Sequence, residues 1–319
     1  MKGHDYYPGV KKYKWYPEDL AGMIGQPVVG NIFYVDANSG SDTANNGKDW
    51  NKAFKTLGKA EDSCTSFNYD VIVVAPSANS VTVEGSITWD KSFITVVGAT
   101  APVQIGQRAR IGFGSTATSP CLAISGMGNR FINLKMVVEE DVNVLISLTG
   151  NRNYFYNCEL AGICNSTTGD DTAARVLSLS AAEENLFENC AIGIDTVARS
   201  AANASVELAS ASTRNIFRGC IFPAWCDNAG VLFVKAASAA DIDRYAIFQN
   251  CIFHNAAYSS STTMTVGFSL HAAVGGTVIL DGCSALGVTD WSSDYTALRG
   301  MNMPDITAAN AGFMEQLAT

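Results

Sequence analysis

Paired carboxylates are the side chains of this sequence whose spacing could support catalysis. Asp170 and Asp171 are adjacent, and Asp241 and Asp243 are two positions apart beside Arg244. Two carboxylates that converge on one bond would suit hydrolysis of a glycosidic bond, and two aspartates on one side of an extended segment could bind a cation. Both pairs are read more simply as solvated loop residues. We therefore expect no catalytic residue and no enzymatic activity.

Metal-binding patterns are equally weak. The histidines have no metal-ligand spacing to one another, which argues against zinc. Asp36, Asn38 and Asp42 have the look of a calcium loop, but a tight loop needs the same residue types. We expect no metal ion and no other cofactor. The histidines are His4, His254 and His271.

Charge and composition narrow the range of partners. The net charge of −9 disfavours binding to a phosphate backbone, so nucleic acid is not an expected partner. No apolar run reaches the roughly 18 residues of a membrane span, and no secretory signal is visible, so we expect no membrane contact either. The nine cysteines are an odd number, typical of reduced thiols in a protein made in a host cytoplasm.

Residues 1–16 are a further candidate for function. They hold four lysines against one aspartate, a net charge of +3, on an otherwise acidic chain. Aromatic rings are interleaved with these lysines, and such rings are common anchors of protein interfaces. We expect this segment to dock on a partner, although the rings could instead fold back on the body of the protein. The expected contact residues are Tyr6, Tyr7, Lys11, Lys12, Tyr13, Lys14, Trp15 and Tyr16.

One short phrase recurs six times along the chain. Its clearest copy reads Asn153-Tyr154-Phe155-Tyr156-Asn157-Cys158, and the six copies end at positions 134, 158, 190, 220, 251 and 283. A period of about 30 residues also fits helical repeats. These phrases, however, are too β-branched and aromatic for amphipathic helices. They therefore predict stacked β coils.

The phrase also predicts a bend between two strands. Its aromatic residue and its cysteine can both point inward only if the chain turns at the residue before the cysteine. That residue is Asn or Gly in every copy, the types that best tolerate a left-handed backbone. Stacked Asn side chains can form a hydrogen-bonded ladder, and buried cysteines act as small apolar residues. The expected ladder consists of Asn133, Asn157, Asn189, Gly219, Asn250 and Gly282, with Cys158, Cys190, Cys220, Cys251 and Cys283.

A second strand precedes each phrase, which gives about eight coils. The candidates are Val144–Leu148, Val176–Leu179, Val206–Leu208, Leu232–Val234 and Val266–Leu270, with earlier members at Val71–Val74, Phe93–Val97 and Leu122–Ile124.

The segments Tyr34–Asp42, Asn46–Trp50 and Ala53–Ala60 resemble the N-terminal part of the pectate-lyase-like right-handed parallel β-helix superfamily, phage virion-associated type. Ala53 departs from the pattern, because many relatives have proline there. The resemblance covers about 31–290 and implies an all-β fold, a right-handed parallel β-helix solenoid with a short N-terminal capping helix. It defines function less well, because the superfamily includes bacterial surface proteins, polysaccharide lyases and phage virion proteins.

The expected organisation has four parts. An extended N-terminal arm covers 1–30, and a first strand, loop and capping helix cover 31–70. The parallel β-helix covers 71–290, and a C-terminal cap or tail covers 291–319. Lys52–Asp62 has helical spacing and would protect strand edges at one end. Thr307–Leu317 could form a helix at the other end.

Three functions compete. The favoured one is a structural virion protein of a bacteriophage, a capsid decoration (cement) or fibre protein that docks on the major capsid protein or another virion protein. Analogy with phage β-helices suggests a homotrimer. The alternative is a polysaccharide-degrading β-helix enzyme or tailspike, for which Trp225, Tyr258 and Trp291 are scattered aromatic candidates. A bacterial surface adhesin would need an export signal.

Overall fold

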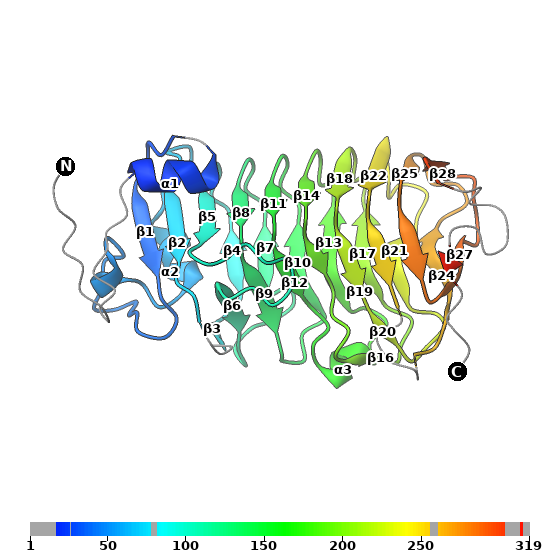
Figure 1. Cartoon of the computed structure of the whole chain (residues 1–319), viewed down its shortest axis with the longest axis horizontal. Coiled ribbons are helices and arrows are strands. Elements are labelled where there is room, and N and C mark those ends of the chain that lie inside the picture. Colours follow the sequence, from blue (N-terminus) through cyan, green and yellow to red (C-terminus); the bar gives the residue numbers. More distant parts are fainter. Residues whose placement is uncertain (1–16, 26, 78–81, 256–260, 304–312, 315–319) are drawn as a thin grey trace.

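The computed structural model describes residues 17–25, 27–77, 82–255, 261–303 and 313–314. They form a right-handed parallel β-helix, which confirms the expected fold class. Three parallel sheets run along an elongated shaft (Figure 1). Each coil passes from the first sheet to the third, then to the second, and returns to the first sheet one coil further along.

In the described residues, the first sheet contains, in order, β1 (Ile32–Val35), β2 (Val71–Val74), β5 (Thr95–Gly98), β8 (Arg130–Ile132), β11 (Tyr154–Tyr156), β14 (Leu186–Glu188), β18 (Asn215–Arg218), β22 (Tyr245–Gln249), β25 (Thr277–Asp281) and β28 (Leu298–Met301). The second contains β4 (Ile87–Trp89), β7 (Leu122–Ile124), β10 (Val144–Leu148), β13 (Arg175–Ser180), β17 (Ala204–Ala209), β21 (Leu232–Ala236), β24 (Met264–Leu270) and β27 (Val288–Ser292). The third contains β3 (Thr82–Glu84), β6 (Arg110–Phe113), β9 (Lys135–Val138), β12 (Glu159–Ala161), β15 (Ala191–Ile192), β19 (Ile221–Pro223), β23 (Ile252–His254), β26 (Ser284–Leu286) and β29 (Phe313–Met314). The remaining elements are the strand pair β16 (Ala198–Arg199) and β20 (Trp225–Cys226), and the helices α1 (Pro17–Ile24), η1 (Trp50–Lys52), α2 (Leu57–Ser63) and α3 (Ser166–Gly169).

The interior of the shaft is built from like residues stacked in register. Phe155 stands opposite Phe131 on one side and Phe187 on the other. The ring centroids are 4.8 Å apart in both pairs, which is the spacing of neighbouring strands. The stack continues through Phe217 and Phe248. Each coil therefore buries its ring against the next coil, as a repeat protein requires.

The bends that follow the first-sheet strands have a left-handed backbone. Asn157 Nδ2 donates to Asn133 Oδ1 at 2.9 Å. The next residue is buried, and its thiol donates to a carbonyl oxygen one coil back, as Cys190 Sγ does to Phe155 O at 3.4 Å. The angle φ lies between 51° and 61° at the six ladder positions Asn133, Asn157, Asn189, Gly219, Asn250 and Gly282.

A second asparagine ladder, which sequence reasoning missed, runs where the chain returns to the first sheet. Asn129, Asn153, Asn185 and Asn215 are at most 1% exposed. Asn153 Oδ1 accepts the backbone N–H of Asn129 at 2.9 Å, and Asn185 Oδ1 accepts that of Asn153 at 2.8 Å. Asn153 Nδ2 donates to Gly126 O at 3.0 Å. These side chains satisfy backbone groups that the buried turns leave without strand partners.

Helix α2 packs at the N-terminal end of the shaft, where Leu57 and Ala60 join the main core (Figure 1). Sequence spacing predicted a helix from Lys52. The helix begins instead at Leu57, because the residues before it are extended and Phe54 forms a β-bridge with Val35. The cap is therefore shorter than expected.

Helix α1 lies across the outer face of the first sheet at the N-terminal end (Figure 1). Leu20 and Ile24 are buried against this face, beside Val73 and Val97. Arg130 donates from a terminal guanidinium nitrogen to Ile24 O at 2.7 Å. Within the segment 1–30, which was expected to be extended, α1 is therefore helical and attached to the shaft.

The strands expected to precede each phrase belong to two different sheets. The strands from Leu122–Ile124 onward form the second sheet, but Val71–Val74 and Thr95–Gly98 pair with each other in the first. Both kinds of strand are short buried apolar runs, and periodicity cannot assign such runs to a sheet.

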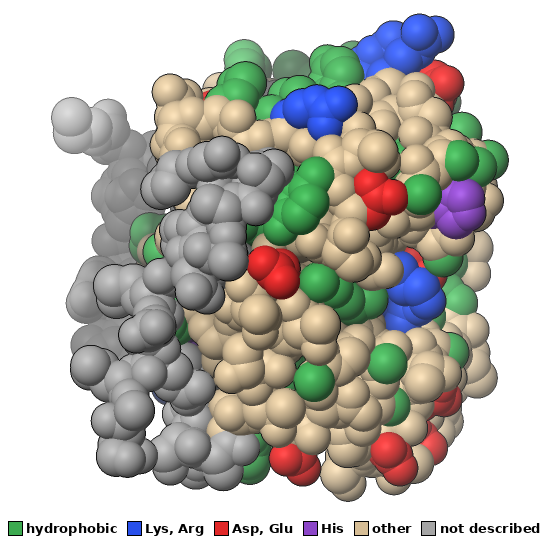
Figure 2. Space-filling view, turned by 90° about the vertical axis from the view of Figure 1, so that its right-hand side faces the viewer, with side chains coloured by type: hydrophobic (Ala, Val, Ile, Leu, Met, Phe, Trp, Pro, Cys, Tyr) green, Lys and Arg blue, Asp and Glu red, His purple; other side chains and the backbone are tan. Residues whose placement is uncertain are grey.

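The C-terminal end also differs from expectation. Phe313–Met314 forms β29 and pairs in parallel with β26, so these two residues are not in the helix expected over Thr307–Leu317. The other residues of that helix lie outside the described residues. Figure 2 looks onto this end and shows hydrophobic, acidic and basic side chains interspersed.

Candidate functional site

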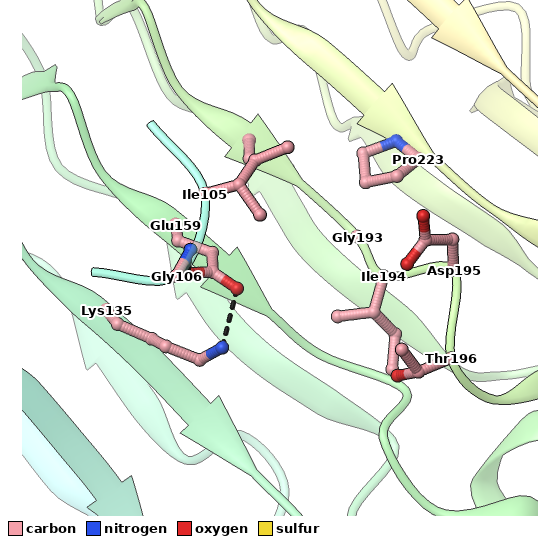
Figure 3. A pocket seen from close by; sticks show the side chains of 10 residues that line it. Ile105, Gly106, Lys135, Glu159, Gly193, Ile194, Asp195, Thr196 and Pro223 are labelled. Carbon is pink, nitrogen blue, oxygen red and sulfur yellow. Dashed lines mark hydrogen bonds and ion pairs between the residues drawn. The ribbon is translucent and has the colours of Figure 1, made fainter. Parts of the chain in front are cut away.

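A cavity of about 250 Å³ opens on the outer face of the third sheet. Strands β9, β12, β15 and β19 contribute its floor. The segment 99–108, here called the strap, forms one wall, and the loop after β15 forms another (Figure 3). The lining residues are Ile105, Gly106, Lys135, Glu159, Ala191, Gly193, Ile194, Asp195, Thr196 and Pro223.

Glu159 joins the floor of the cavity to the strap. Its Oε1 lies 2.6 Å from Lys135 Nζ (Figure 3). Its Oε2 accepts the backbone N–H groups of Gly106 at 2.7 Å and Gln107 at 3.2 Å. The side chain of Glu159 is 6% exposed and that of Lys135 is 17% exposed. Solvent ions therefore screen this ion pair less than a surface pair. Glu159 therefore holds the strap on the sheet.

Gln104 anchors another point of the strap. Its Nε2 donates to the carbonyl oxygens of Cys190 at 3.2 Å and Gly219 at 3.1 Å. Gly219 is a bend position without an asparagine side chain, so the strap supplies an amide group there. The strap thus bridges coils that are far apart in the sequence.

Asp195 is exposed and lies across the cavity from Lys135 (Figure 3). Within the described part of the chain, its carboxylate has no hydrogen-bond or ion-pair partner. Ile105, Ile194 and Pro223 add apolar contact surface around the opening. The cavity can therefore hold a small ligand with both polar and apolar faces, and the Asp195 carboxylate is placed to accept a hydrogen bond from it.

Sequence reasoning did not select Lys135, Glu159 or Asp195. Lys135 and Glu159 each follow the last position of a repeat phrase, and they face each other on neighbouring strands. Equivalent positions of successive coils stack one strand spacing apart. The coil period was therefore a usable signal for this ion pair, whereas nothing in the sequence places the loop that carries Asp195.

The paired aspartates considered from the sequence are engaged by protein groups, in part from the neighbouring coil. Asp171 Oδ2 accepts from Asn143 Nδ2 at 2.8 Å. Asp241 accepts the backbone N–H of Ser210 at 3.2 Å, and Asp243 forms an exposed ion pair with the adjacent arginine. These contacts stabilise turns.

The calcium-like loop is also held by protein donors. Asp36 Oδ1 accepts the N–H of Asn38 at 3.1 Å, and its Oδ2 accepts the hydroxyl of Ser39 at 2.6 Å. Asp42 Oδ1 accepts the N–H of Lys55 at 2.8 Å. Among the residues that the structure describes, no group of three or more His, Cys, Asp or Glu side chains is arranged to hold a metal ion.

The ladder cysteines are buried core residues. Burial raises the pKa of Cys190 and Cys220 well above the usual value of a thiol, so neither is a reactive thiolate. No helix within the described ranges is long and apolar enough to cross a membrane. The expected partner-binding residues of the arm, Tyr6, Tyr7, Lys11, Lys12, Tyr13, Lys14, Trp15 and Tyr16, lie outside the described residues.

No family model matches this chain, and no curated protein matches it in sequence. Solved structures do share its fold. The pectate lyase Pel9A matches with a TM-score of 0.57 and 16% identity, over 86% of this chain and 69% of its own. A rhamnogalacturonan lyase matches with a TM-score of 0.54 and 16% identity, over 81% and 68%.

A virus protein is also among these structures. ORF18 of Geobacillus virus E2 matches with a TM-score of 0.52 and 13% identity, over 86% of this chain and 55% of its own. At such low identities these similarities show the parallel β-helix fold alone.

The conclusion from the sequence that the chain is not an enzyme was wrong. Several solved structures that share its fold are enzymes, including the two lyases above, a pectin methylesterase and an α-1,3-glucanase. The absence of a recognisable pair of catalytic carboxylates in the sequence was not a sufficient reason to exclude enzymatic activity. The coils bring Lys135, Glu159 and Asp195 from separate segments to one cavity.

Proposed function

We propose that this chain is a structural protein of a bacteriophage particle, a capsid decoration or fibre protein that docks through its N-terminal arm. Its partner is the major capsid protein or another virion protein, and it is located in the virion as a homotrimer. The fold similarity to ORF18 of Geobacillus virus E2 is the observation that favours a virus particle.

The attachment of α1 supports docking through the preceding residues. Leu20 and Ile24 are buried on the first sheet, and Arg130 hydrogen-bonds the last carbonyl of the helix. A partner bound to residues 1–16 would therefore be connected to the rigid shaft through only a short stretch of chain. The four lysines and the aromatic rings of 1–16 supply charge and apolar contact for that partner.

The test is copurification with intact particles, followed by rebinding to particles that lack the protein. Deletion of 1–16 should leave the shaft folded by circular dichroism and abolish rebinding. Replacing the four lysines by glutamine, or Tyr6, Tyr7 and Trp15 by alanine, separates the contribution of charge from that of the rings. Full rebinding by the truncated protein would contradict docking through the arm.

A polysaccharide-active β-helix protein is the second candidate. The cavity with Lys135, Glu159 and Asp195 favours it, as does the fold shared with pectate and rhamnogalacturonan lyases. Incubation with pectate, pectin, rhamnogalacturonan or α-1,3-glucan, with and without Ca²⁺, should then give new reducing or unsaturated ends. Asp195→Asn should remove this activity. Activity that persists in Asp195→Asn would locate the chemistry elsewhere, and absence of products from every substrate would count against the second candidate.

A further inference from the structure

Small residues create the cavity on the third sheet. Ala191 pairs with Glu159 on one side and with Ile221 on the other, so a short side chain lies between two long ones. Gly193 has φ of 113°, which turns the chain away from β15. A Cβ at Gly193 would lie 2.5 Å from Pro223 O, so glycine is what allows the following loop to pass this close to β19. The hollow floor and the wall beside it therefore both depend on small side chains.

The charged groups around the cavity leave one negative charge without a partner. Lys135 Nζ and Glu159 Oε1 are 2.6 Å apart and neutralise each other. Glu159 Oε2 is also occupied, because it accepts the backbone N–H groups of Gly106 and Gln107. Among the described residues that line the cavity, the remaining charged side chain is Asp195, on the opposite wall (Figure 3). A ligand in the cavity therefore meets a net negative charge.

An anionic ligand is disfavoured by this arrangement. To reach Lys135 it would have to displace Glu159, and breaking a buried ion pair in this way is strongly unfavourable. A carboxylate elsewhere in the cavity would lie near Asp195, and neighbouring like charges disfavour the ionised forms of both groups. The net charge of −9 on the chain adds repulsion at longer range. The cavity is thus suited to a neutral or cationic ligand, and the unpaired carboxylate favours a cation.

The rest of the lining is largely apolar. Ile105 projects from the strap and is 58% exposed. Ile194 comes from the loop after β15, and Pro223 comes from β19 (Figure 3). These side chains offer contact to the C–H groups of a ligand. The volume of about 250 Å³ lies below the roughly 300–1,000 Å³ of pockets for drug-sized molecules, so the cavity suits one compact ring.

We propose that the cavity binds a sugar ring that carries an ammonium group, as in an amino sugar without an N-acetyl group. The ammonium donates a charge-assisted hydrogen bond to Asp195, and the C–H groups of the ring pack against Ile105 and Pro223. This inference rests on the second candidate function, that of a polysaccharide-active protein. It selects a cationic glycan over pectate.

The experiment is calorimetric titration of the full chain with three oligosaccharides of equal length, at a pH at which amino groups are protonated. They are a glucosamine oligomer, its fully N-acetylated form and a galacturonate oligomer. The glucosamine oligomer should bind about tenfold or more tightly than the other two. Its affinity should fall as the salt concentration rises, because added ions screen the exposed carboxylate.

Two matched variants locate the charge that is responsible. Asp195→Asn keeps a hydrogen-bond acceptor but removes the charge, so it should weaken binding of the glucosamine oligomer about three- to tenfold and reduce its salt dependence. Asp243→Asn removes an exposed carboxylate that does not line the cavity. It changes the net charge by the same amount and should bind as the native chain does. Circular dichroism should show both variants to be folded.

Three results would overturn the proposal: tighter binding of the galacturonate oligomer, no binding of the glucosamine oligomer, or native affinity for it in Asp195→Asn. Failure of the second candidate function is read separately, from the assay for new chain ends. Products from pectate without binding of the glucosamine oligomer would retain that function and reject this inference. Binding of the glucosamine oligomer that depends on Asp195, without products from any substrate, would retain the binding site and reject the enzyme.

Discussion

Glu84 Oε1 accepts the backbone N–H of Leu57 at 2.5 Å, which places a buried carboxyl group of the third sheet at the first turn of the capping helix α2. Glu84 is only 4% exposed. Burial raises its pKa from 4.5 to about 7, although hydrogen bonds from Leu57 and Gly58 oppose that rise. The N-terminal cap of the shaft is thus coupled to the protonation of one side chain.

Stability should fall as pH rises from about 5 to 8. Between the unfolded pKa of 4.5 and the folded pKa of about 7, the folded chain holds a proton on Glu84 that the unfolded chain releases. Protonated Glu84 therefore contributes on the order of 3 kcal/mol to the free energy of unfolding. This contribution is complete below pH 4.5 and is lost as the pH rises through 7. Glu61 shifts in the same direction, chiefly by burial.

Denaturant unfolding at several pH values measures this dependence. Glu84→Gln keeps an acceptor for Leu57 but has no titrating proton, so its stability should vary less with pH. Glu139→Gln changes an exposed carboxylate and should keep the slope of the native chain. Equal slopes for the native chain and Glu84→Gln would show that Glu84 does not carry the effect.

Asn185→Ala should destabilise the shaft by about 2–4 kcal/mol. The side chain accepts the N–H of Asn153 and donates to Asn215 Oδ1 at 3.0 Å, both in the core. Its removal leaves buried polar groups without partners, and each such group costs about 1–3 kcal/mol. The free energy of unfolding measures the loss. Asn38→Ala, at an exposed position, is the control and should change it by less than about 0.5 kcal/mol. Similar losses in the two variants would mean that the buried ladder is not a stabilising element.

Phe187→Ala should cost about 3–5 kcal/mol, because it empties one position in the ring stack. The ring of Phe187 lies 4.8 Å from those of Phe155 and Phe217 and is fully buried. Leu186→Ala is the matched control, since Leu186 is the adjacent residue on the half-buried outer face. In the same chemical unfolding experiment, Leu186→Ala should lower the free energy of unfolding clearly less than Phe187→Ala does. A cost for Phe187→Ala no larger than that of the control would argue against the stack as the core of the shaft.

Glu159→Gln should release the strap without unfolding the coils. It weakens the ion pair with Lys135 and the hydrogen bonds to Gly106 and Gln107. Hydrogen bonds to charged groups contribute about 1.5–3 kcal/mol, so amide exchange at 106 and 107 should accelerate about tenfold or more. Glu139→Gln should leave this exchange unchanged. Protection that survives in Glu159→Gln would mean that the other contacts of the strap, such as those of Gln104 and the backbone bond from Ser77 to Arg108, hold it in place.

Much of the fold could be predicted from the repeat phrase, because spacing in sequence becomes stacking in space. The phrase predicts a turn at Asn157 and at Asn189, because the aromatic residue and the cysteine of each copy can both point into the core only if the chain bends between them. The burial of Phe155 follows from the same constraint. The buried asparagines, such as Asn153, were visible in the same phrase. They were overlooked because a polar residue at a strand start is ordinarily assigned to a solvated loop.

The cavity could not be predicted in the same way. Its wall depends on the strap, whose contacts to Glu159 and Cys190 join segments without any periodic relation. The position of Asp195 likewise depends on loop geometry. Loops that vary from coil to coil carry no repeating signal, so their arrangement becomes visible only in three dimensions.

The direction of the backbone hydrogen bonds has a mechanical consequence. Strands lie across the shaft, so their interstrand bonds point along its length. Tension applied at the two ends would load these bonds directly, and the coils would peel away from an end in sequence. A sideways load would instead be shared by many coils at once, which makes the same molecule stiff against bending and weak against stretching.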